Sequence, residues 1–214
     1  LYHTDWVADR TLAWLREQGE SPWFCWMSFP DPHHPWDVPR SELHRVNWRD
    51  LDLPAAYLDS DDARRVLSTK PKHWLGYYEA SLWSNLESPR EYVPADMTAD
   101  QVREINAMTH IENELIDEAC QRVIEHLKAQ NWYDQTDIFF TTDHGELQGD
   151  YGLMFKGPYH VDALMRLPLI WKPGQERGAP QVIDEPVGHV DLAPTFCAIA
   201  GIEPEQMDGA VLPT

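Results

Sequence analysis

Apolar residues recur at helical spacing in two long stretches of the chain. The first covers residues 4–17 and is followed by Gly19, a residue type that often ends a helix. The second begins after the tetrapeptide Thr-Ala-Asp-Gln at 98–101, whose Thr and Gln form the pattern of a capping box. We therefore predict a helix over 4–17 and a long amphipathic helix that starts at residue 98 and is closed by Asn131.

Three short apolar runs rich in β-forming residues predict buried strands. They are WFCWMSF at 23–29, TDIFF at 136–140 and LPLIW at 167–171. The second run directly follows the long helix, which is the helix-to-strand order of an α/β fold. A last helix is predicted to start within 191–195 and to end at Gly201.

The remaining segments are rich in proline and aromatic residues. Four prolines between positions 30 and 39 exclude a helix and predict an extended loop. Residues 37–96 show no strand pattern, so we predict a loop-rich excursion that could act as a substrate lid. Its aromatic residues could line a pocket, but packing of the excursion is the favoured explanation. They include Trp48, Trp74, Tyr77, Tyr78 and Trp83.

Composition narrows the class of protein. The 214 residues include 43% hydrophobic residues and 10 Trp, as expected for a packed globular protein. No window approaches twenty uninterrupted apolar residues, so no membrane span is predicted. The net charge of −19 argues against binding to nucleic acid, which requires clustered cations. The three Cys are far apart and form no disulfide framework, and nothing in the sequence indicates a cellular location.

Candidate chemistry concentrates in residues 141–160, TTDHGELQGDYGLMFKGPYH. Asp143 and His144 follow a predicted strand, and open α/β sheets place ligand sites at the carboxyl ends of their strands. A carboxylate and a neutral imidazole can together ligate a divalent cation. Spacing alone favours a plain turn, in which Asp and Gly serve for their conformational tolerance.

This region resembles the sulfatase family of the alkaline phosphatase superfamily. Members show motifs similar to TDHGE at 142–146, GDYGL at 149–153, FKG at 155–157 and RLPLI at 166–170. Tyr151 departs from the pattern, because many members carry His there. The PHHPW loop at residues 32–36 and the segment VDLAPT starting at residue 190 also match.

The resemblance implies a fold and an activity. The fold is an α/β, partial alkaline phosphatase-like core with a mixed, mostly parallel sheet flanked by helices, and residues 1–214 form a single partial domain. The activity is that of a sulfuric ester hydrolase acting on a small-molecule or carbohydrate sulfate ester. Members use a divalent metal ion, here expected to be Ca²⁺ with Mg²⁺ or Mn²⁺ as alternatives, and a formylglycine nucleophile.

The family's site residues map onto four positions of this sequence. Asp143 and His144 match the later pair of metal ligands, although His144 could instead hydrogen-bond to the nucleophile. His33 matches the histidine that contacts sulfate and can protonate the leaving group. Lys156 matches the lysine that contacts sulfate oxygens. The alternative is that Lys156 is an ordinary exposed lysine without a role in the site.

Two neighbours of these positions are expected to play smaller parts. His34 falls on the variable position of the PHHPW loop, so we expect its ring to face solvent or the rim of the pocket. Glu146 is the acidic residue of the TDHGE motif, and we expect it to support the site from behind or to serve only in the turn.

Other parts of the family's active site have no match in this sequence. No Cys or Ser is followed by the Pro or Ala and the Arg that formylglycine formation requires. Asp61 and Asp62 are the only adjacent Asp pair, and no apolar run precedes them. We therefore expect a fragment that lacks the amino-terminal part of the core and the carboxy-terminal subdomain, and that is inactive alone. Alternatives are a phosphonate monoester or phosphodiester hydrolase, or a non-catalytic fragment.

Overall fold

The computed structural model describes residues 2–19, 21–82, 92–174, 181–203 and 206–213. The chain divides into two compact units. The first consists of Leu1–Tyr133 and His144–Leu167, and the second of Asp134–Asp143 and Pro168–Thr214. No helix in the described part of the chain is both long enough and apolar enough to cross a membrane.

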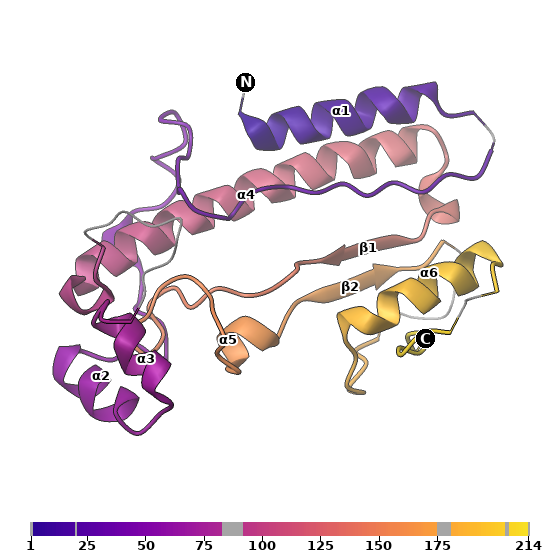
Figure 1. Ribbon diagram of the computed structural model, residues 1–214. Coiled ribbons are helices and arrows are strands. Elements are labelled where there is room, and N and C mark those ends of the chain that lie inside the picture. Colours follow the sequence, from indigo (N-terminus) through magenta and orange to yellow (C-terminus); the bar gives the residue numbers. More distant parts are fainter. Residues whose placement is uncertain (1, 20, 83–91, 175–180, 204–205, 214) are drawn as a thin grey trace. The chain divides into compact units, whose positions relative to one another are not determined.

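Two helices, α1 (His3–Glu17) and α4 (Ala99–Ala129), pack side by side in the first unit (Figure 1). Both were predicted from their apolar spacing, and the capping box at the start of α4 is present. Asn131 has a φ of 59°, the left-handed conformation that closes a helix. The guanidinium of Arg122 on α4 pairs with Asp5 and Asp9 on α1 and so links the two helices.

Residues 23–29 were predicted to form a buried strand, and this prediction is wrong, because they form no strand in the described part of the chain and alternate residues are exposed. Trp23 packs against Trp14 of α1, with ring centroids 5.9 Å apart, and against Trp132. Phe24 and Trp26 on the alternate face are 64% and 69% exposed. An apolar run becomes a strand only where a second strand satisfies its backbone groups.

The excursion over residues 37–96 carries two short helices, α2 (Ser60–Leu67) and α3 (Lys72–Tyr78), and two 3₁₀ turns, η1 (Trp48–Asp50) and η2 (Pro94–Asp96). Trp74, Tyr77 and Tyr78 of α3 are buried in the core of the first unit. The packing explanation is thus confirmed for these three aromatic residues. Trp48 is half-buried, and Trp83 lies outside the described residues.

The first unit is completed by residues 144–167, which form successive turns and the short helix α5 (Asp162–Met165). Leu147, Leu153 and Met154 bury their side chains in the same core as α3. The backbone N–H of Tyr151 donates to the carbonyl of Ala56 at 2.8 Å, so the excursion and these turns are joined directly. This packing attaches the turns that carry the FKG motif to the core of the first unit.

The second unit is built on an antiparallel strand pair, β1 (Ile138–Thr141) and β2 (Leu169–Lys172), in which Ile138 lies opposite Lys172. Phe139 of β1 stacks on Trp171 and meets Phe196 of α6 (Leu192–Ala200) edge-on, both at 5.0 Å. Short 3₁₀ turns, η3 (Tyr133–Gln135) and η4 (His189–Asp191), precede β1 and α6. Both predicted strands and the final helix are present, and Gly201 ends α6 in the left-handed conformation. The prediction that the strands are buried is wrong, because Phe140 and Ile170 are 45% and 61% exposed.

Candidate active site

Two of the predicted catalytic residues, His33 and Lys156, are in direct contact in the first unit. The Nζ atom of Lys156 lies 2.6 Å from Nε2 of His33, although 123 positions separate the residues in sequence. His33 comes from the proline-rich loop, and Lys156 follows the last turn of the GDYGL segment. The fold therefore places an ammonium and an imidazole together, as the family resemblance implied for these residues.

The hydrogen bonds of His33 assign its tautomer. Its Nδ1 atom lies 2.6 Å from the carbonyl oxygen of His34, which can only accept, so Nδ1 carries the proton. Nε2 then holds the lone pair and accepts a hydrogen bond from the Lys156 ammonium. His33 as a residue is exposed.

Glu146 lies on the other side of Lys156. Its Oε2 atom is 3.9 Å from Nζ, and the side chains of both residues are largely buried. A carboxylate at this distance attracts the ammonium and limits where it can point. Glu146 was expected to support the site or to serve only in the turn, and its contact with Lys156 agrees with the supporting role.

Phe155 holds the backbone from which Lys156 projects. Its φ is 62°, a conformation that is costly for a bulky residue by about 1–3 kcal/mol. The ring is only 3% exposed and stacks on Trp36 with centroids 5.7 Å apart. The Phe155 carbonyl also accepts a 2.9 Å hydrogen bond from the Leu147 N–H. Packing thus enforces a strained backbone next to the lysine.

His34 is placed differently from the expectation that its ring faces solvent or the rim. The ring is half-buried and lies between His33, at 4.1 Å between centroids, and Phe155, at 4.5 Å. The expectation is wrong because the ring beneath it, Phe155, belongs to the core of the unit. Sequence could not reveal this contact, since it joins two loops that are far apart in the chain.

The glycines of the motif are required by close approaches. A Cβ atom on Gly145 would lie 1.8 Å from the carbonyl oxygen of Ala163. Gly149 has a φ of 107°, and a Cβ there would lie 2.6 Å from Cγ1 of Val102. Tyr151, the departure from the family pattern, packs edge-on against Trp74 at 5.7 Å. The turn is therefore kept intact by packing despite this substitution.

The two predicted metal ligands, Asp143 and His144, are adjacent in sequence but belong to different units. Asp143 is exposed and accepts a 3.3 Å hydrogen bond from the hydroxyl of Thr142 within the second unit. Nδ1 of His144 lies 2.8 Å from the Gly145 carbonyl in the first unit. In the described part of the chain, no group of three or more His, Cys, Asp or Glu side chains is placed to hold a metal ion. Metal ligation by these two residues remains a prediction.

Two buried acidic residues that were not predicted from the sequence, Asp31 and Glu112, belong to the first unit, and Asp31 ties the start of the His33 loop to α1. The carboxylate of Asp31 accepts a hydrogen bond from the Thr4 hydroxyl and binds the ring of His3, both on α1. Glu112 of α4 is fully buried, and its carboxyl oxygens have no hydrogen-bond partner among the described residues. Burial, and then the negative charges of Asp31 and Asp37, raise the pKa of Glu112 to about 8.

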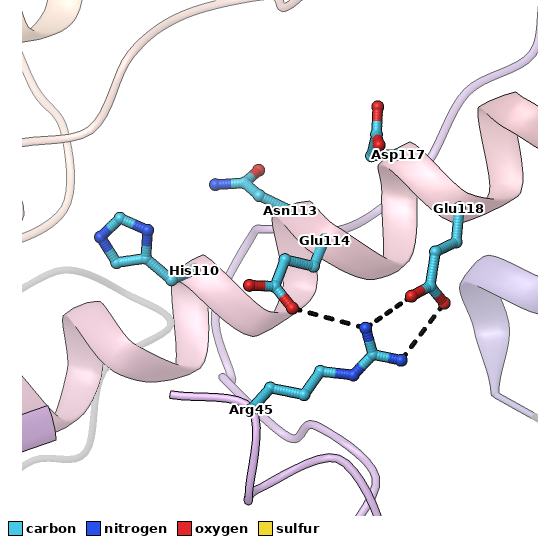
Figure 2. Close-up of a pocket in the computed structure, with 6 residues that line it drawn as sticks. All are labelled: Arg45, His110, Asn113, Glu114, Asp117 and Glu118. Carbon is cyan, nitrogen blue, oxygen red and sulfur yellow. Dashed lines mark hydrogen bonds and ion pairs between the residues drawn. The ribbon is translucent and has the colours of Figure 1, made fainter. Parts of the chain in front are cut away.

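A shallow hollow of about 530 Å³ lies on the acidic face of α4 (Figure 2). Arg45 reaches across it to the carboxylates of Glu114, at 3.4 Å, and Glu118, at 3.2 Å. Neither His33 nor Lys156 lines this hollow, and its surplus of carboxylates opposes an anionic substrate. We therefore place the candidate active site at the contact between His33 and Lys156.

Comparison with known proteins identifies relatives along nearly the whole chain. A sulfatase from Escherichia coli K12, described as the uncharacterized sulfatase YidJ, is 29% identical over 95% of this chain and 37% of its own length. The multifunctional alkaline phosphatase superfamily protein PehA of Trinickia caryophylli is 28% identical over 95% of this chain and 39% of its own length. The chain thus spans about two fifths of these relatives.

The fold is shared with solved structures. The phosphonate monoester hydrolase from Silicibacter pomeroyi superimposes with a TM-score of 0.79 and 28% identity, over 99% of this chain and 40% of that protein. This similarity supports the α/β, alkaline phosphatase-like fold expected from the sequence. The sulfatase family profile matches residues 1–202. With its motifs and its fold in agreement, the chain belongs to the sulfatase family.

Proposed function

We propose that this chain contributes His33 and Lys156 to the active site of a metal-dependent sulfuric ester hydrolase. The observation that carries the proposal is the 2.6 Å contact between Lys156 Nζ and His33 Nε2. A lysine ammonium suits a tetrahedral anion, which offers several acceptor oxygens, and the neighbouring imidazole lies close enough to serve the same ligand. The substrate is proposed to be a small-molecule or carbohydrate sulfate ester.

The two side chains have separate roles in this proposal. The Lys156 ammonium donates hydrogen bonds to the ester's non-bridging oxygens and offsets their negative charge. In this proposal the ammonium turns from Nε2 of His33 to the ester oxygens when the substrate binds, which frees Nε2 to take up a proton and then donate it to the oxygen of the departing alcohol. Glu146, with Oε2 3.9 Å from Nζ of Lys156, limits the directions in which the ammonium can point.

A divalent ion, with Ca²⁺ preferred, would be held by Asp143 and His144. The bond from His144 Nδ1 to the Gly145 carbonyl fits this role, because it leaves the lone pair on Nε2 and metal-binding histidines are commonly oriented this way. Since Ca²⁺ takes about six to eight ligands, this pair needs further ligands from elsewhere in the protein. When bound, the ion would polarise the sulfate oxygens.

Phosphonate monoester or phosphodiester hydrolysis is the second candidate. It is favoured by the 28% identity and TM-score of 0.79 to a phosphonate monoester hydrolase. A lysine and a histidine also suit a phosphonate, whose oxygens are arranged in the same tetrahedral way. The contact between His33 and Lys156 does not separate the two esters, and a direct comparison of substrates is required.

The test compares the full-length protein with an aryl sulfate, an aryl phosphonate monoester and an aryl phosphodiester. We expect the largest kcat/KM for the sulfate, and Lys156→Ala should lower it about 100-fold, as for loss of one preorganised donor. Lys72→Ala removes an exposed lysine at the start of α3 and serves as the matched control. A larger kcat/KM for the phosphonate would favour the second candidate.

Two further outcomes bear on the proposal. No turnover of any of the three esters by the full-length protein would support the non-catalytic alternative. The 214-residue chain by itself is expected to hydrolyse none of them, because it contains no formylglycine motif. Turnover by this chain alone would show that the nucleophile is another residue.

A further inference from the structure

We propose that His34 is a positioning residue, whose ring and backbone carbonyl together hold His33 with Nδ1 protonated and Nε2 directed into the candidate site. The inference rests on the proposed function of His33 as the acid that serves the leaving group. It adds a residue at the variable position of the loop, for which the family resemblance implied no role.

The first argument is how the rings are layered. His33 is exposed, and its ring lies on that of His34 with centroids 4.1 Å apart and planes inclined by 25°. The His34 ring rests in turn against the buried Phe155, at 4.5 Å. An exposed imidazole would otherwise change rotamer on the nanosecond timescale. The layered rings connect it to the core and restrict that motion.

The second argument is hydrogen bonding at both ring nitrogens. Nδ1–H of His33 donates to the His34 carbonyl, and Nε2 accepts from Lys156, each at 2.6 Å. A rotation of the His33 ring by half a turn about its Cβ–Cγ bond would place a ring carbon where each nitrogen lies. Both hydrogen bonds would then be broken. The ring therefore has one favoured orientation, with Nε2 directed at the ammonium.

The third argument is that His34 connects the two loops of the site. His33 and His34 are consecutive on one loop, and Phe155 and Lys156 are consecutive on the other. The ring of His34 contacts the ring of Phe155, and His33 contacts Lys156. Two consecutive residues of one loop therefore contact two consecutive residues of the other. Removing the ring of His34 would leave a gap between His33 and the core beneath it.

The test reads the His33 tautomer directly. In full-length protein labelled with ¹⁵N-histidine, the imidazole signals of His33 are assigned by their loss in His33→Gln. We expect the neutral wild-type ring to be protonated on Nδ1, and His34→Phe to keep this tautomer because an aromatic ring still supports His33. His34→Ala should give a mixture of the two tautomers. His44→Ala is the matched control, since Nδ1 of this exposed His also lies 2.6 Å from a backbone carbonyl oxygen.

Kinetics supply the second readout. His34→Ala should lower kcat about three- to tenfold with KM unchanged, the size expected for losing one aromatic contact, while His34→Phe stays near wild type. The proposal is wrong if wild-type His33 is protonated on Nε2, which needs no variant to observe. It is also wrong if His34→Ala keeps the wild-type tautomer, or if His34→Phe and His34→Ala behave alike. If the tautomers follow expectation but no ester is cleaved, the proposed function fails and the positioning role stands.

Discussion

The fully buried carboxyl of Glu112 makes the stability of this protein depend on pH. Its pKa is raised from 4.5 to about 8, chiefly by burial and then by the charges of Asp31 and Asp37. At pH 7 the folded protein therefore keeps this carboxyl protonated, whereas the unfolded chain ionises it. Folding must take up a proton at this residue, and that uptake becomes less favourable as the pH rises.

The magnitude follows from the two pKa values. The difference between 4.5 and about 8, at about 1.36 kcal/mol per pKa unit, gives about 5 kcal/mol in total. Because the folded-state pKa is the higher one, this stability is fully present below pH 4.5 and is lost as the pH rises toward 8. At pH 7 the loss amounts to about 3 kcal/mol, a large part of the stability of a typical domain.

Replacing Glu112 with Gln tests this reasoning, because the amide has the same shape and cannot ionise. The variant should match the wild type near pH 4 and exceed its free energy of unfolding by about 3 kcal/mol at pH 7. Urea unfolding followed by tryptophan fluorescence at half-unit pH steps would measure the difference. Glu104→Gln, an exposed residue on the same helix, should change little at any pH. Parallel stability curves for the wild type and Glu112→Gln would refute the reasoning.

Three other predictions concern the cap, the turn and the metal. Thr98→Ala removes the side-chain acceptor of the Gln101 N–H and should cost about 1 kcal/mol in urea unfolding, with Thr98→Ser as the near-neutral control. Gly149→Ala should cost more than about 1 kcal/mol, because φ is 107° and the new Cβ would meet Val102; an unchanged melting temperature would contradict this. Ca²⁺ at about 100 times its Kd should stabilise the full-length protein by about 2.7 kcal/mol, and this gain should vanish in Asp143→Asn. Equal stabilisation of the wild type and Asp143→Asn by Ca²⁺ in calorimetry would show that Asp143 is not a ligand.

The sequence alone was sufficient wherever structure is set by neighbouring residues. The capping box at Thr98 and the left-handed ends at Asn131 and Gly201 mark helix boundaries, since these effects act within one turn. The runs that form β1 and β2 were likewise identifiable from β-forming residues. His33 and Lys156 were predicted as site residues from short motifs, and the structure shows the contact between them.

Tertiary structure decided everything that depends on a distant partner. Residues 23–29 have the pattern of a strand, yet a strand needs a second backbone beside it, which no local pattern specifies. Glu112 is an acidic residue in an amphipathic helix, and only the packing around α4 buries it. The contact of His34 with Phe155 joins loops about 120 positions apart. Such burial and contact arise from the path of the whole chain, so they emerge only when the fold brings these segments together.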